Sequence, residues 1–178
     1  LTTNVIKEIL QKLHLKIDEI TKRENEYHSI IIEFKNTRVE SEIHFERLLW
    51  DFLQALHDED SKSYNWNNTI DKDPNSKFFS FSIKEEGFYI IGMHPKSSRE
   101  PRRSKYPAIV FNRHSQFEQL RKKGIYQNVR DTIRKRDLIY SGDLNPMVQD
   151  FGDVSENSQY SGRAVDLEKW TCPLKIKS

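Results

Sequence analysis

The chain has 178 residues, of which 35% are hydrophobic, 31% charged and 11% aromatic, so we expect a modest core under a heavily solvated surface. The aromatic content argues against a disordered chain, and the single cysteine, Cys172, excludes an internal disulfide framework. The net charge of +2 conceals an asymmetry: residues 94–136 carry 13 Lys or Arg against 3 Asp or Glu, which suggests an anionic partner for this basic half.

The pattern of apolar residues also bears on location. No apolar run approaches the roughly 18 residues of a membrane span. The N-terminus lacks the basic start and the apolar stretch of a signal peptide. We therefore expect a cytoplasmic protein with no membrane partner.

The N-terminal third predicts a helix, a strand and a second helix. Residues 3–24 place isoleucines and leucines at helical spacing, and such a stripe packs on its own domain or, alternatively, forms the seam of a homodimer. Within residues 27–34, the β-branched run Ile30-Ile31-Ile32 predicts a short buried strand. Residues 38–59 return to helical periodicity, and the polar loop 61–76 follows with Trp66 as its apolar anchor.

The middle of the chain predicts a small sheet followed by two more helices. The expected strands are 77–83, 88–93 and 106–112, with a hairpin loop at 84–87. The expected helices are 115–123 and 125–139, separated by Gly124 as a helix C-cap. After Ser141 the chain lacks periodicity but keeps aromatic residues, so we expect an ordered loop that wraps the core. The predicted fold is a single α+β domain over residues 1–178: a small mixed or antiparallel sheet packed by several helices, with a long ordered C-terminal loop region.

Two of the six histidines lie directly after predicted strands, a position where functional sites are common. His94 follows the apolar strand 88–93, and His114 follows the strand that includes Ala108–Phe111. Neutral imidazole is a common ligand of haem iron. The alternative for each is a strand-end histidine that bonds backbone atoms. For the other four we expect surface or satisfied side chains.

A basic loop surrounds His94. Residues 96–105 combine serine hydroxyls with arginine forks, which suit planar carboxylates or phosphates. A solvated basic loop is the plainer interpretation, and a nucleic-acid interface is a third. The sequence shows no recognition-helix signature, RNA-binding aromatic motif or zinc spacing. Phosphate-loop, dinucleotide, zinc-protease and serine-hydrolase motifs are also missing. Cys172 could supply a thiolate to iron, although a buried or incidental cysteine is the more common case.

Several ordered blocks resemble one family, the YqcI/YcgG proteins. The stretch Gly92-Met-His-Pro-Lys-Ser-Ser-Arg99 is similar to the family's Gly-x-His-Pro-x-Ser-Ser-Arg motif. The match continues in order through these blocks: Arg102-Arg103, Tyr106–Asn112, Gln116–Arg121, Arg130–Asp137, Gly142–Met147, Ser155–Arg163 and Trp170–Pro173. Phe45–Asp58 also fits. Residues 1–37 depart from the pattern, since they lack the family's Phe-Pro-Cys-type entry segment.

The resemblance implies a haem b protein of the GntA-like branch, which hydroxylates nitrogen on guanidino amino acids. By motif, His94 corresponds to the axial ligand, with His114 as the alternative. Haem or substrate contacts are implied for Ser98, Arg99, Arg102, Arg103, His114, Gln159 and Arg163. Catalytic roles are implied for Glu156, Asn145 and Tyr160, with Glu156 as the carboxylate for a guanidinium and Glu118 as second choice.

The implied reaction is monooxygenation of a small guanidino or amino-acid-like substrate, with oxygen or peroxide and an electron donor. One alternative is a haem-binding sensor or carrier without turnover. Another is a basic nucleic-acid-binding protein without a cofactor, although we expect no nucleic-acid partner.

Overall fold

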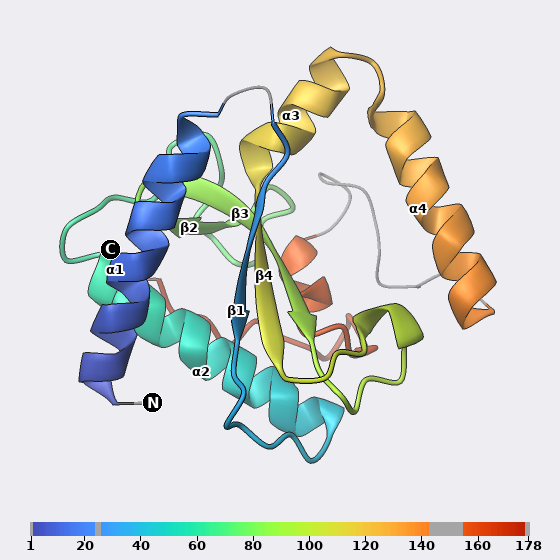
Figure 1. The fold of residues 1–178 in the computed structure, drawn as a ribbon, viewed down its shortest axis with the longest axis horizontal. Helices are drawn as coiled ribbons and strands as arrows, with labels where there is room; N and C mark the ends of the chain where they lie inside the picture. Colours follow the sequence, from blue (N-terminus) through green and yellow to red (C-terminus); the bar gives the residue numbers. More distant parts are fainter. Residues whose placement is uncertain (1, 24–25, 143–154, 177–178) are drawn as a thin grey trace.

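The computed structural model describes residues 2–23, 26–142 and 155–176, which form helices around one antiparallel sheet (Figure 1). The elements in chain order are α1 (Thr3–Thr21), β1 (Ser29–Glu33), α2 (Glu42–Asp60), β2 (Phe81–Ile83), β3 (Glu86–Met93), the 3-10 turn η1 (Glu100–Arg102), β4 (Ala108–Arg113), α3 (His114–Lys122), α4 (Tyr126–Ser141) and the 3-10 turn η2 (Glu156–Gln159). The strand order is β1-β4-β3-β2, with every neighbouring pair antiparallel. The predicted α+β class is confirmed. Within the described residues, no helix is long and apolar enough to cross a membrane.

The main core lies between one face of the sheet and the pair α1 and α2. Even-numbered residues of β3, such as Phe88 and Ile90, face this core, as do Ile109 and Phe111 of β4. The apolar stripe of α1 is buried within the chain, in the same core as the apolar face of α2. Because the stripe is already covered, it does not form the homodimer seam that the sequence left open.

The prediction of a buried first strand is wrong. β1 is an edge strand whose residues alternate between exposed and half-buried, and Ile31 is 60% exposed. Ile30 and Ile32 pack against the core from the other face. A run of three isoleucines therefore predicts a strand, but it does not predict which faces of the strand other elements cover.

The hairpin between β2 and β3 is a two-residue turn. Lys84 and Glu85 have φ values of 53° and 58°, the left-handed geometry that such a turn requires and that non-glycine residues adopt at a cost. Asp60 accepts the Lys84 backbone N–H at 3.0 Å, and the Lys84 ammonium contacts Asp18 at 2.5 Å. These contacts hold the turn against the ends of α1 and α2.

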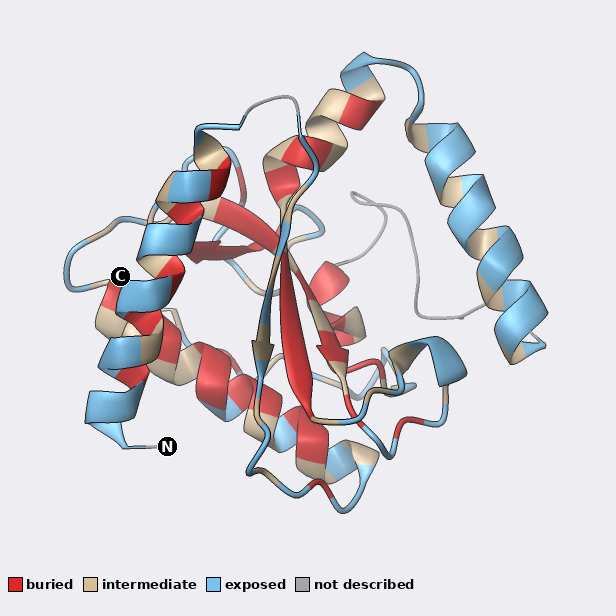
Figure 2. Cartoon of the chain, in the orientation of Figure 1, coloured by how far each residue is buried: buried red, intermediate tan, exposed pale blue. Residues whose placement is uncertain are grey.

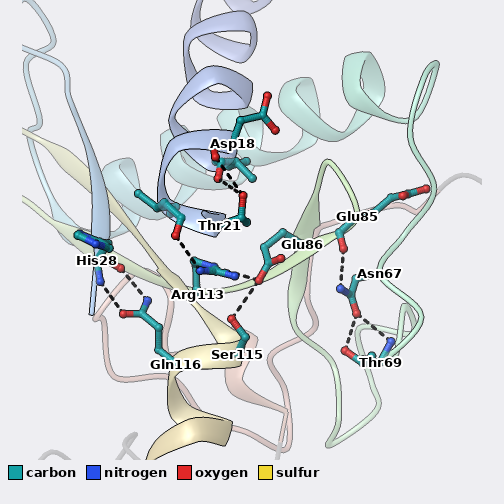
Figure 3. A network of polar contacts seen from close by, with 12 residues as sticks. Asp18, Thr21, His28, Asn67, Thr69, Glu85, Glu86, Arg113, Ser115 and Gln116 are labelled. Carbon is teal, nitrogen blue, oxygen red and sulfur yellow. Dashed lines mark hydrogen bonds and ion pairs between the residues drawn. The ribbon is translucent and has the colours of Figure 1, made fainter. Parts of the chain in front are cut away.

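Further polar contacts connect the same end of the sheet to its neighbours (Figure 3). Arg113 at the end of β4 donates to the carbonyl of Ile20 in α1 and to the carboxylate of Glu86 in β3. Gln116 in α3 both donates to and accepts from the His28 backbone, next to β1. α1, α3 and the sheet are thereby fixed relative to one another.

The C-terminal segment from residue 155 to 176 packs along the edge of β3 beyond the short β2. The Gly92 N–H donates to the Tyr160 carbonyl at 2.7 Å, so the chain continues the pairing that β2 leaves unfinished. Gln54 of α2 exchanges two hydrogen bonds with the Lys175 backbone. For these residues the predicted ordered, core-wrapping loop is confirmed.

Candidate functional site

His94 is a buried imidazole directly after β3. The side chain is 1% exposed and stacks on Phe45 of α2, with ring centroids 4.3 Å apart and an interplanar angle of 28°. Its Nδ1 accepts a hydrogen bond from the Lys96 backbone N–H at 3.2 Å. Its Nε2 is buried and has no hydrogen-bond partner among the residues that the structure describes. A buried polar atom without a partner is uncommon in folded proteins, so this nitrogen is a candidate position for ligand binding.

Burial lowers the pKa of His94 below its usual range, and the nearby carboxylate of Glu42 offsets only part of this effect. The ring is therefore neutral at physiological pH, as a metal ligand must be. Because Nδ1 accepts the Lys96 N–H, the neutral ring in this arrangement carries its proton on Nε2. Ligation through Nε2 requires that proton to move to Nδ1, which removes the Lys96 hydrogen bond and therefore needs a local rearrangement of the ring or the loop.

The three arginines around His94 already bind protein atoms. Arg99 of this loop pairs with Asp137 of α4 at 2.9 Å. The Arg102 guanidinium donates to the carbonyls of Gly92 and Gln159, at 3.2 and 3.4 Å, and burial lowers its pKa to about 10. Arg103 donates to two carbonyls within its own loop. These contacts brace the loop, and the haem-contact roles implied by the resemblance stay predictions.

Ser98 and Arg163, two further predicted contacts, both bind α2. The Ser98 hydroxyl and backbone N–H donate to Glu42 in the first turn of the helix. Arg163 forms an ion pair with the buried Glu46, which also accepts from Ser161 and Trp170. The Gln159 backbone carbonyl accepts from Arg102. All three residues therefore help to hold the loop and the C-terminal segment in place.

His114 lies at the opposite end of the sheet from His94. It begins α3, its ring stacks on Tyr89 with centroids 5.1 Å apart, and burial lowers its pKa. Its Cβ lies 3.3 Å from the position a Cβ on Gly87 would take. From Gly87 to His94 the strand runs seven residues, or roughly 23 Å. The two histidines therefore cannot serve one iron, and each defines its own candidate site.

Glu156 is a buried carboxyl group near the His114 end. One oxygen accepts from the Tyr160 hydroxyl at 2.6 Å and from the Ser80 hydroxyl at 2.8 Å. The other oxygen is buried and finds no hydrogen-bond partner in the described part of the chain. Burial raises the pKa of Glu156 to about 8, although the two hydroxyls favour the ionised form. At neutral pH the carboxyl is mainly protonated.

Tyr160 connects the two ends of β3. Its carbonyl accepts from Gly92 near His94, while its hydroxyl reaches Glu156 and accepts from the Phe81 N–H at 3.2 Å. Burial raises its pKa well above the usual range. The phenol is therefore a fixed neutral donor to Glu156. Asn145, the third residue given a catalytic role, lies outside the described residues.

Two hollows that the sequence did not predict lie at the C-terminal end of α2. They measure about 420 and 410 Å³, share Asp60 and Tyr64, and are not lined by His94 or His114. Between them, His14 contacts Asp60 at 2.6 Å, which satisfies His14 as the sequence suggested. Within the described residues, no group of three His, Cys, Asp or Glu is arranged to hold a metal ion.

Comparisons with known proteins give one match. No curated protein and no solved structure matches the chain. The model of the YqcI/YcgG family matches residues 2–175, which includes the divergent N-terminus as well as the motif blocks. The chain is therefore a member of the YqcI/YcgG family.

Proposed function

We propose that this protein binds haem b through His94 and hydroxylates nitrogen on a small guanidino or amino-acid-like substrate. The observation that carries the proposal is the buried His94 Nε2 without a partner, in the family motif and at the end of a core strand. One axial imidazole is sufficient to hold a haem iron. Bound haem would supply the activation of oxygen or peroxide that N-hydroxylation needs.

The residues around His94 suit the ligand role. Stacking on Phe45 fixes the plane of the ring, and burial keeps the imidazole neutral. The same burial excludes water from the ring nitrogen. The three arginines of the loop suit propionates less well than the resemblance implies, because their guanidinium groups already bind protein atoms.

The position of Glu156 distinguishes between the two candidate iron ligands, His94 and His114. Glu156 contacts Ser80, which also donates to the carbonyl of Phe88, and β3 runs roughly 20 Å from Phe88 to His94. A carboxylate at this distance does not bind a substrate at an iron held by His94. Near His114 it could, since Ser80 links Glu156 to the backbone of Phe88, the neighbour of Tyr89, on which His114 stacks.

The test is haem uptake by the wild type beside three histidine variants. The protein is expressed with haem supplied, and the Soret band is compared for wild type, His94→Ala, His114→Ala and the control His44→Ala. We expect the band to be lost only in His94→Ala. If the Soret band were lost only in His114→Ala, the protein would still bind haem, but the iron ligand would be His114, at the end of the sheet where Glu156 lies. A colourless wild type would remove the proposal.

Turnover is tested separately on the haem-loaded protein. Arginine and its analogues are added, the spectrum is followed, and N-hydroxy products are sought by mass spectrometry. We expect a substrate-induced spectral change and a hydroxylated product. A stable spectrum of iron with two protein ligands, and no product, would instead indicate a haem sensor or carrier.

A further inference from the structure

β1 forms an open edge of the sheet, and this name is used here for residues Ser29–Glu33. The strand pairs with β4 on one side, and no described strand lies on its other side (Figure 1). The opposite edge is closed, because β2 is only three buried residues long and the Gly92 N–H beyond it donates to the Tyr160 carbonyl. The open edge is therefore the place where a further strand can join the sheet.

The hydrogen bonds between β1 and β4 show which backbone groups of β1 are directed outward. The Phe34 N–H donates to the Pro107 carbonyl at 2.8 Å, in register with the pairing of the two strands. Residues of an antiparallel pair alternate between those that exchange hydrogen bonds with the neighbouring strand and those that do not. The even-numbered residues of β1 therefore bond to β4. The N–H and C=O groups that point away from β4 belong to Ser29, Ile31 and Glu33.

The open edge lacks the features that commonly keep edge strands from pairing. Natural edge strands often carry Lys, Pro or a bulge, whereas β1 has three consecutive isoleucines and one charged residue, Glu33. The three residues with outward backbone groups are all exposed, and Ile31 is 60% exposed (Figure 2). Such an edge favours pairing with a strand of another chain.

The same edge is complementary to itself. In an antiparallel pair of two β1 strands centred on Ile31, each Ile31 lies opposite the Ile31 of the other copy, and each Glu33 lies opposite a Ser29. The exposed isoleucines then cover each other, and each carboxylate faces a neutral side chain. A pair centred on Glu33 would place two carboxylates directly opposite each other, which is destabilising. Apolar character and charge therefore favour the register centred on Ile31.

We propose that β1 pairs with β1 of a second copy of this chain, antiparallel and centred on Ile31, and so joins the two four-stranded sheets into one. The outward N–H and C=O groups exchange roughly six backbone hydrogen bonds across the two-fold axis. Because the described part of each chain has one open edge, assembly stops at the dimer. One strand pair is smaller than a standard interface of about 1,200 Å² or more, so we expect a dissociation constant on the order of micromolar. This dimer does not depend on the proposed function.

The experiment measures the mass of the full chain by sedimentation velocity at concentrations from about 1 to about 300 µM. We expect the mass to rise from 21.2 kDa towards twice that value. Ile31→Lys places like charges opposite each other, and Ile31→Pro removes the central outward N–H, a change that an edge strand tolerates. The matched control is Ile133→Lys on α4, since Ile133 is 59% exposed. We expect both Ile31 variants to weaken dimerisation about tenfold or more and the control to change it less than about twofold.

Three results would overturn the proposal. These are a wild type that stays at the monomer mass throughout, a mass that grows beyond the dimer, or dimerisation that is lost in Ile133→Lys and kept in the Ile31 variants. Circular dichroism of each variant checks that the monomer is folded.

Cross-linking tests the register separately, in a Cys172→Ser background that leaves no other thiol. The Cα atoms of a hydrogen-bonded antiparallel pair lie about 5.5 Å apart, which a disulfide spans without strain. We expect Ile31→Cys to form a covalent dimer on mild oxidation and Ile133→Cys to stay monomeric. A dimer by mass that Ile31→Cys fails to cross-link would contradict the register centred on Ile31.

Discussion

At the scale of single residues, two of the buried polar groups that lack a hydrogen-bond partner within the described residues lie near opposite ends of β3. His94 offers a ring nitrogen, and Glu156 offers a carboxyl oxygen. Each costs stability in the absence of a partner, because a buried polar atom loses its water without replacement. Both lie in blocks that resemble motifs of the family.

Glu156 predicts a stability that falls as pH rises. Its carboxyl has a pKa of about 8 in the folded protein against a usual value of 4.5. Between these values the folded state binds the proton more tightly than the unfolded state does, so stability present below about pH 4.5 is lost as pH rises towards 8. The loss is at most a few kcal/mol, at about 1.4 kcal/mol per pH unit.

The measurement is urea unfolding at pH 5, 7 and 8.5 for the wild type and Glu156→Gln. The amide keeps an oxygen for the Tyr160 and Ser80 hydroxyls but cannot ionise. We expect the pH slope to be smaller in the variant, which becomes the more stable protein at pH 8.5. Equal slopes in the two proteins would show that Glu156 does not carry the effect.

At the scale of elements, the sequence predicts the helices well and the surroundings of the strands less well. The periodicity of residues 3–24 and 38–59 corresponds to α1 and α2 because both helices bury one apolar stripe. Burial of β1 could not be predicted, because coverage of Ile31 depends on whether another element packs over that face. The partners of Glu156 could not be predicted either, since Ser80 is 76 positions away and only the fold brings it near.

Gly92 is where β3, α2 and the C-terminal segment meet most tightly. A Cβ there would lie 2.6 Å from Cε1 of Phe45, 2.7 Å from the Tyr160 carbonyl oxygen and 2.8 Å from Cδ1 of Leu49. The carbonyl is backbone held by its own hydrogen bond to Gly92, so it cannot move aside cheaply. We expect Gly92→Ala to lower the free energy of unfolding by about 3 kcal/mol or more.

Gly124→Ala is the matched control for that substitution. Gly124 has a φ of +68°, and a Cβ there meets nothing within 4 Å, so only the left-handed backbone is penalised. We expect a loss of roughly 1 to 2 kcal/mol. Denaturant unfolding measures both variants, and a Gly92→Ala protein as stable as Gly124→Ala would contradict the tight packing.

At the scale of the whole molecule, the described residues divide into a well-buried body and a helix on its periphery. α2 contributes nine buried residues to the body, whereas α4 has none, and Figure 2 shows α4 mostly exposed, with intermediate patches between. α4 contacts the rest of the chain chiefly through α3 and through η1, where Asp137 pairs with Arg99. The loop around His94 is therefore connected to the least buried helix of the described chain.

This division predicts a large difference in hydrogen exchange between the two helices. Elements with few buried apolar contacts open locally at little cost, so we expect α4 amides to exchange about a hundredfold faster than α2 amides or more. Mass spectrometry of exchanged peptides measures the difference, and Asp137→Asn should raise exchange in α4 further while leaving α2 unchanged. Protection of α4 equal to that of α2 would contradict the prediction. If that protection then fell on dilution, a second copy of the chain would be the element that covers Ile133 and Ile139, which are 59% and 71% exposed in the single chain.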